Sequence, residues 1–161
     1  MTVLASLGVD MCNLHAFGTK AMMEAAIEGL EIGSKGKRPI LIAVTQLTST
    51  SEERMKNDLL IDKNIADVCV HYAKCAKESG LDGVVCSPLE AGVIKENCGK
   101  EFFTVTPGIR FADGDVGDQV RITTPEKAKE IGSDYIVVGR PITAASDPVA
   151  AYKRCVAEFV G

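Results

Sequence analysis

The sequence predicts an α/β fold in which five strands of a parallel sheet alternate with helices. One observation is a series of short, mostly continuous apolar runs, which are typical of strands buried in a parallel sheet. A second is that helical periodicity or a helix-start signal follows each run. A third is that the strand exits are polar, and ligands bind at such exits in α/β proteins. The predicted strands are residues 9–15, 40–44, 81–86, 102–106 and 135–138.

The helices of the first half are predicted from their end signals. Residues 1–8 look like the end of a helix closed by Gly8, and His15 lies at the exit of the first strand. Thr19 is the expected N-cap of a helix over residues 20–30, where apolar residues recur at helical spacing. Ser51 is followed by two glutamates, which are favourable at the positive end of a helix dipole, so a helix should start there.

The second half repeats the same alternation. Gly80 should stop an amphipathic helix, and Thr124 followed by Pro125 marks another helix start. The loop from residue 107 to about residue 122 is long for a compact domain, which is typical of a working lid or a disordered segment. The predicted helices of this half are residues 62–79, 89–96, 124–131 and 147–159.

The last strand carries the most informative exit. Tyr135–Val138 should be a buried strand, and it runs into Gly139, Arg140 and Pro141. A glycine allows a backbone N–H to approach a ligand closely, and an arginine offers a planar fork of donors suited to phosphate. A strand that ends in an ordinary turn with a solvated arginine is the alternative interpretation.

Composition narrows the function class. The chain of 161 residues suits one domain, residues 1–161, with 46% hydrophobic and 25% charged residues. Its net charge of −4 argues against a nucleic-acid-binding or membrane-surface protein. No apolar run approaches the ~20 residues of a membrane span, and the N-terminus lacks the basic start of a signal peptide.

The six cysteines form no C-x-x-C pair and no metal-ligand spacing with the two histidines, so no zinc site is expected. Buried free thiols in a reducing cytoplasm are the favoured interpretation. No G-x-G-x-x-G opens a helix, which weighs against a dinucleotide-binding fold. A phosphate site built from the exits of the last two strands is instead common in (β/α)8 barrels.

Five motifs in register give the chain a family resemblance. They are Val44-Thr-Gln-Leu-Thr-Ser-Thr, Leu81-Asp-Gly-Val-Val-Cys-Ser-Pro, Val105-Thr-Pro-Gly-Ile-Arg, Gly117-Asp-Gln and Asp134-Tyr-Ile-Val-Val-Gly-Arg-Pro-Ile-Thr. Together they resemble bacterial orotidine 5′-monophosphate decarboxylase over essentially the whole chain. The resemblance implies a (β/α)8 barrel, usually a homodimer, that converts orotidine monophosphate to uridine monophosphate without a cofactor.

The resemblance also implies roles for individual residues. Thr48 matches the residue that contacts the pyrimidine or its ribose, and Arg110 matches a ligand-side arginine. Gln119 matches a lid glutamine that bridges base and phosphate, as an amide can with its donor and acceptor. Gly139 and Arg140 match the phosphate clamp. The alternatives are a plain loop hydroxyl or helix cap for Thr48 and a surface ion pair for Arg110, while His15 is expected to be structural.

The chain also departs from the family pattern. The family's catalytic Asp-x-Lys-x-x-Asp motif does not occur; the nearest run, Asp58-Leu-Leu-Ile-Asp-Lys63, has the wrong spacing. The chain is therefore expected to correspond to barrel strands four to eight, an incomplete barrel with no catalytic residue of its own.

Five strands cannot close an eight-stranded barrel, so two sheet edges and an apolar face should be open. A second copy or a missing N-terminal fragment is expected to cover them. The alternatives to a truncated decarboxylase are a non-catalytic nucleotide- or phosphate-binding module and a sugar-phosphate enzyme of a sister family, such as the hexulose-phosphate synthases.

Overall fold

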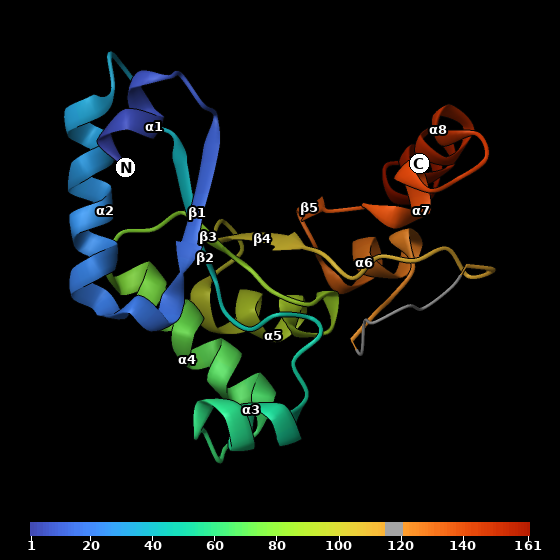
Figure 1. Ribbon diagram of the computed structural model, residues 1–161, viewed down its shortest axis with the longest axis horizontal. Coiled ribbons are helices and arrows are strands. Elements are labelled where there is room, and N and C mark those ends of the chain that lie inside the picture. Colours follow the sequence, from blue (N-terminus) through green and yellow to red (C-terminus); the bar gives the residue numbers. More distant parts are fainter. Residues whose placement is uncertain (115–120) are drawn as a thin grey trace.

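The computed structural model, which describes residues 1–114 and 121–161, contains one parallel five-stranded sheet with the strands in chain order, β1 to β5. This arrangement confirms the predicted alternation of strands and helices (Figure 1). Four of the five strands are shorter than predicted. They are β1 Met11–His15, β2 Ile40–Val44, β3 Gly83–Val85, β4 Phe103–Thr106 and β5 Tyr135–Ile136.

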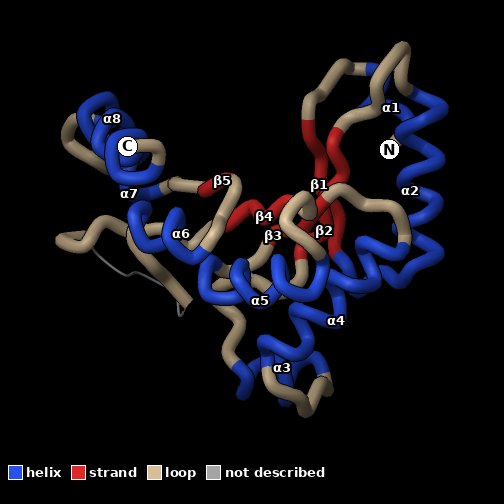
Figure 2. The backbone as a smooth tube through the Cα atoms, turned by 180° about the vertical axis from the view of Figure 1, so that it is seen from behind, coloured by secondary structure: helices blue, strands red, loops and turns tan. Residues whose placement is uncertain are grey.

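Helices follow the strands along the chain, and α2, α4 and α5 lie beside the sheet (Figure 2). The short α7 and the 3₁₀ turn η1 were not predicted. The elements are α1 Thr2–Ser6, η1 Ala16–Gly18, α2 Thr19–Gly33, α3 Glu52–Leu59, α4 Ile65–Glu78, α5 Pro88–Cys98, α6 Pro125–Ile131, α7 Arg140–Thr143 and α8 Pro148–Phe159.

Aspartates hold the amino ends of two strands in register. The carboxylate of Asp82, just before β3, accepts a hydrogen bond from the backbone N–H of Leu41 at 2.7 Å and is paired with Arg38. The carboxylate of Asp134, just before β5, does the same for Thr104 at 2.7 Å and is paired with Lys95. Each carboxylate thus accepts a hydrogen bond from a strand N–H and pairs with a positively charged side chain. Charged groups at this edge therefore serve the fold, which leaves the opposite edge for a ligand.

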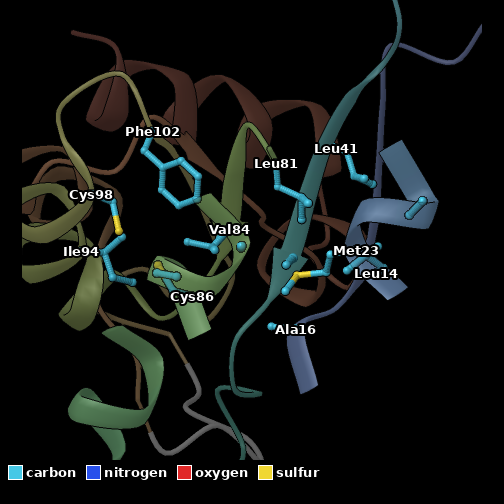
Figure 3. Close-up of a cluster of buried hydrophobic side chains, with 14 of the residues drawn as sticks. Leu14, Ala16, Met23, Leu41, Leu81, Val84, Cys86, Ile94, Cys98 and Phe102 are labelled. Carbon is cyan, nitrogen blue, oxygen red and sulfur yellow. The ribbon is translucent and has the colours of Figure 1, made fainter. Parts of the chain in front are cut away.

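The core lies on the face of the sheet that the helices cover. Because side chains alternate along a strand, Leu14, Ala43 and Val84 share this face through their register. All three belong to one buried cluster with residues of α2, α4 and α5. Figure 3 shows Val84 and Cys86 near Phe102 and Ile94, with Met23 close to Leu14 further along the sheet. This packing fixes the strand exits relative to one another.

The opposite face of the sheet is also apolar. The register aligns Val44, Val85, Val105 and Tyr135 across it. None of these four belongs to the helix-covered core cluster, and Tyr135 at the edge is 46% exposed. An apolar face with an exposed edge residue is what the interior of an unclosed barrel would present.

The prediction of a buried strand over Tyr135–Val138 was wrong. The strand ends at Ile136, and Val137 is 50% exposed. The reason is the position of β5, which pairs only with β4 among the described residues and so forms an edge. A continuous apolar run predicts a strand, but whether another element covers it is decided by its neighbours.

One of the two predicted N-caps is confirmed: the side chain of Thr124 accepts a hydrogen bond from the backbone of α6. The predicted helix starts at Ser51 and Asp147 are also confirmed, and both side chains cap their helices, α3 and α8. Thr19 was wrongly predicted as a cap: the N-cap of α2 is Gly18, and Thr19 is its first residue. The backbone of Thr19 has φ 74° and ψ 165°, a region that is essentially restricted to glycine because a Cβ crowds the backbone there.

Replacing Thr19 with glycine should stabilise the protein. The strained conformation costs about 1–3 kcal/mol, and the exposed side chain of Thr19 loses little packing when it is removed. After the entropic cost of glycine, we expect a net gain of about 1 kcal/mol, or roughly 2–4 °C in Tm. Thermal unfolding followed by circular dichroism measures it. Thr19→Ala is the matched control: it keeps the Cβ and the strain, so an equal gain from alanine would contradict this account.

Candidate functional site

The exits of the strands lie along one edge of the sheet because every pair of neighbouring strands is parallel. Thr45 and Ser87 follow β2 and β3 and are buried, whereas His15, the last residue of β1, is exposed. Arg110 follows β4 and is buried; Arg140 follows β5 and is exposed. The polar residues predicted for this edge are therefore on one side of the molecule, away from the aspartates at the strand starts.

Arg110 and Arg140 line one cavity of about 320 Å³, with Phe111, Gly114 and Pro141 among its other walls. They come together because β4 and β5 pair in register, Val105 beside Tyr135, so their exits are neighbours. Among residues 1–114 and 121–161, no acidic side chain lines it. Two guanidinium groups carry permanent positive charge and planar sets of donors, an arrangement suited to a phosphate or carboxylate.

Arg110 is held firmly within this wall. It is 8% exposed; its backbone N–H donates to Thr123 at 3.0 Å, and its guanidinium donates to the carbonyl of Ile109 at 2.7 Å. The hydrogen bond to Ile109 uses one of the five N–H donors of the guanidinium group. The buried methylene chain of Arg110 restricts the orientation of the other donors. Arg110 is therefore the more rigid of the two arginines, because Arg140 is exposed.

Gly139 and Arg140 form the turn from β5 into α7. The carbonyl of Gly139 accepts hydrogen bonds from the backbone of Ile142 at 2.9 Å and Thr143 at 3.0 Å, which begins the helix immediately. A Cβ built on Gly139 would meet no described atom within 4 Å. The space beside this backbone is therefore open to a ligand, as the sequence interpretation of the glycine requires.

The last helix supports one wall of the cavity. The guanidinium of Arg154, on α8, stacks over the ring of Phe111 with its carbon 4.2 Å from the ring centre. Arg154 also donates to both carboxylate oxygens of Asp113 at 3.0 and 3.2 Å and to Glu158 at 2.6 Å. The hydrogen bond from Arg154 lowers the pKa of Asp113. These contacts fix Phe111, next to Arg110, against the C-terminal part of the chain.

Thr48 lies beside the exit of β4, although it follows β2 in sequence. It is 6% exposed, and a Cβ built on Gly108 would come within 3.2 Å of its Cγ2 atom. Gly108 itself has φ 87°, and that Cβ would also be 2.8 Å from the carbonyl oxygen of Arg121. Only glycine fits there. The structure thus places Thr48 against Gly108, which is two residues before Arg110 in the sequence. The exits of β2 and β4 are therefore close enough to contact one ligand.

A buried ion pair that the sequence analysis missed lies behind Thr48. Arg121 donates to the carboxylate of Glu90, and both side chains are almost fully buried. Glu90 also accepts a hydrogen bond from the backbone N–H of Ser87 at 2.9 Å, in a capping box at the start of α5. Burial raises the pKa of Glu90, and the charge of Arg121 opposes the shift. The pattern Ser87-x-x-Glu90 was a readable signal for the cap, but nothing local pointed to Arg121.

A second cavity of about 330 Å³ lies at the exits of β1 and β2. Its polar lining includes His15, Arg54 and Asp58, and its apolar lining includes Phe17 and Leu59. The ring of His15 packs against that of Phe17 with centres 5.1 Å apart. Asp58 belongs to the run nearest to the catalytic motif of the resembled family, and the structure places it on α3.

Neither cavity has the donor set of a metal site. Over residues 1–114 and 121–161, no group of three or more His, Cys, Asp or Glu side chains is placed to hold a metal ion. The six cysteines are free, and four of them are buried. Burial raises the pKa of Cys69 and Cys86, which keeps them protonated. In the same described part of the chain, no helix is long and apolar enough to span a membrane.

A family model described as "Orotidine 5'-phosphate decarboxylase / HUMPS family" matches residues 1–155, nearly the whole chain. The chain belongs to this family. The resemblance seen in the five sequence motifs is thereby confirmed.

Curated relatives and solved structures agree with this assignment. The chain is 60% identical over 163 aligned residues to proteins named orotidine 5′-phosphate decarboxylase from Bacillus mycoides and Bacillus cereus, covering 100% of the chain and 68% of each relative. The crystal structure of the Lactobacillus acidophilus protein of that name superposes with a TM-score of 0.85 at 44% identity, covering 99% of the chain and 67% of the other. An uncharacterised Geobacillus kaustophilus protein gives a TM-score of 0.81 at 48% identity, covering 98% and 67%.

The chain differs from the pattern of this family in two respects. The chain spans about two-thirds of the length of these relatives, and its sequence has no Asp-x-Lys-x-x-Asp run. Of the predicted site residues, Arg110 and Arg140 line one cavity. Gly139 directly precedes Arg140, and Thr48 lies against Gly108, two residues before Arg110. Gln119 lies outside the described residues, so its predicted role stays a prediction.

Proposed function

We propose that the chain binds the 5′-phosphate of orotidine and uridine monophosphates, as the phosphate-binding part of an orotidine 5′-monophosphate decarboxylase. The observation that carries this proposal is that Arg110 and Arg140, from neighbouring strand exits, line the same cavity. A phosphate dianion would satisfy both guanidinium groups, and charge-assisted hydrogen bonds of this kind are the strong ones. Thr48, beside Gly108, lies on the side where the nucleoside would continue.

The same reasoning assigns no chemical step to the chain on its own. Decarboxylation leaves negative charge on a ring carbon, which a cation must stabilise and then protonate. The family does this without a cofactor, with a lysine held among carboxylates in the motif that this sequence lacks. Binding of the phosphate, remote from the reacting carbon, provides binding energy that can lower the activation barrier of the reaction at the ring. The 161 residues therefore provide the remote binding and none of the proton transfer.

A second function remains open because the family description also names the HUMPS group. Its sugar-phosphate substrates would use the same pair of arginines but have no pyrimidine for Thr48 to contact. The motif around Thr48 and the 60% identity to proteins named as the decarboxylase favour a nucleotide over a pentulose or hexulose phosphate.

Titration calorimetry with three ligands tests the proposal. Uridine monophosphate should bind; uridine, which lacks the phosphate, should bind at least about 100-fold more weakly, because two charge-assisted contacts are lost. Ribulose 5-phosphate should bind more weakly than uridine monophosphate. Equal affinity for uridine and its monophosphate would exclude the phosphate site, and tighter binding of the pentulose phosphate would favour the sister function.

A further inference from the structure

Arg121 joins three segments that are distant in sequence. Its guanidinium donates to Glu90 on α5, 31 residues away, and to the carbonyl of Leu47 at 2.8 Å, 74 residues away. A weaker contact of 3.4 Å reaches the carbonyl of Gln46. Its backbone N–H donates to the carbonyl of Thr48 at 3.3 Å. Three successive carbonyl groups of the β2 exit therefore face one residue.

Arg121 also contacts the exit of β4. Its carbonyl oxygen lies 2.8 Å from the position that a Cβ on Gly108 would take. Two residues later, Thr123 donates to the carbonyl of Gly108 at 3.2 Å and accepts from the backbone of Arg110 at 3.0 Å. The segment that contains Arg121 and Thr123 therefore forms backbone hydrogen bonds with both the loop of Thr48 and the loop of Arg110.

The chemistry of this contact requires arginine. A planar guanidinium can donate to a carboxylate on one side and to backbone carbonyls on another, whereas the ammonium of lysine is a single compact group. The paired carboxylate of Glu90 is fixed by the capping box of α5, which packs in the core. Through Arg121, the exit of β2 is therefore tied to a rigid helix and not only to its own strand.

We infer that Arg121 is a positioning residue for nucleotide binding: it holds the Gln46–Thr48 loop in place and so acts through Thr48. This inference rests on the proposed nucleotide site and assigns Arg121 no contact with the ligand. The phosphate cavity is lined by Arg110 and Arg140 and does not include the Gln46–Thr48 loop. Arg121 should therefore matter for the nucleoside part of a ligand and not for its phosphate.

The test compares two ligands in the full chain. Arg121→Met should weaken binding of uridine monophosphate about tenfold, as expected when one hydrogen-bonding group is misplaced. Binding of inorganic phosphate, which lacks both the base and the ribose, should be unchanged. The matched control is Arg38→Met, which removes an arginine paired with Asp82 and bonded to the Gly80 carbonyl at the opposite edge of the sheet. That control should lower Tm and leave the affinity for both ligands unchanged.

A double-mutant cycle with Thr48→Ala checks that the effect passes through Thr48. In the Thr48→Ala background, Arg121→Met should cause no further loss of affinity for uridine monophosphate, because residues that act as a unit are not additive. Additive losses, or an equal loss for both ligands, would overturn the inference.

If Arg121→Met does not fold, Arg121→Lys can replace it, because lysine keeps a positive charge beside Glu90. This variant should also lose affinity for uridine monophosphate alone. An unchanged affinity for uridine monophosphate would overturn the inference. Failure of the unmodified chain to bind uridine monophosphate would instead overturn the proposed function, and the inference with it.

Discussion

Replacing Arg140 with alanine should lower the affinity for uridine monophosphate by about 10- to 100-fold. The side chain supplies one of the two guanidinium groups of the cavity, and a hydrogen bond to a charged group contributes about 1.5–3 kcal/mol. Arg140 is exposed, so its removal should hardly change Tm. Titration calorimetry on both proteins, with Tm measured in parallel, gives the result.

Two controls make the Arg140 result specific. Lys153→Ala removes a positive charge from an exposed position on α8 that does not line the cavity, and it should leave the affinity unchanged. The affinity of the unmodified chain should also fall as salt is added, because exposed charges are screened, and the variant should be less sensitive. If Arg140→Ala and the unmodified chain bind uridine monophosphate with equal affinity, the phosphate does not bind in the cavity lined by Arg110 and Arg140.

The largest effect should come from adding the missing catalytic motif. The 161-residue chain alone should not convert orotidine monophosphate detectably. Mixed with a polypeptide that contains the first three βα units of the Bacillus cereus relative, it should do so at a rate several orders of magnitude above the uncatalysed reaction. The physical basis is the sheet: β1 and β5 each pair on one side only among the described residues, and the apolar face between them is that of an unclosed barrel.

Turnover would be followed by the change in pyrimidine absorbance. One control uses the same added polypeptide with the motif lysine replaced by alanine, and it should give no activity. The other uses the Arg140→Ala chain, which should lower activity because phosphate binding contributes to the barrier reduction. Turnover by the 161-residue chain alone would show that another lysine and its carboxylates do this chemistry, and it would contradict the proposed division of roles.

Much of this protein could be predicted from local sequence. Apolar runs located all five strands, and the helix starts predicted at Ser51, Thr124 and Asp147 are the ones observed. These features depend on residues a few positions apart, so a sequence pattern contains the whole cause. The five motifs also indicated the family that the comparisons show, and with it the arginines that line the cavity.

Tertiary structure alone decided the rest. Whether Tyr135 and Val137 are buried depends on what lies beside β5, and an edge position leaves both about half exposed. The ion pair of Arg121 and Glu90 and the contact of Thr48 with Gly108 join segments that only the folded sheet brings together. Such contacts leave no local pattern because the two partners are far apart in the sequence. Their burial and pairing exist only once the strands have been placed side by side.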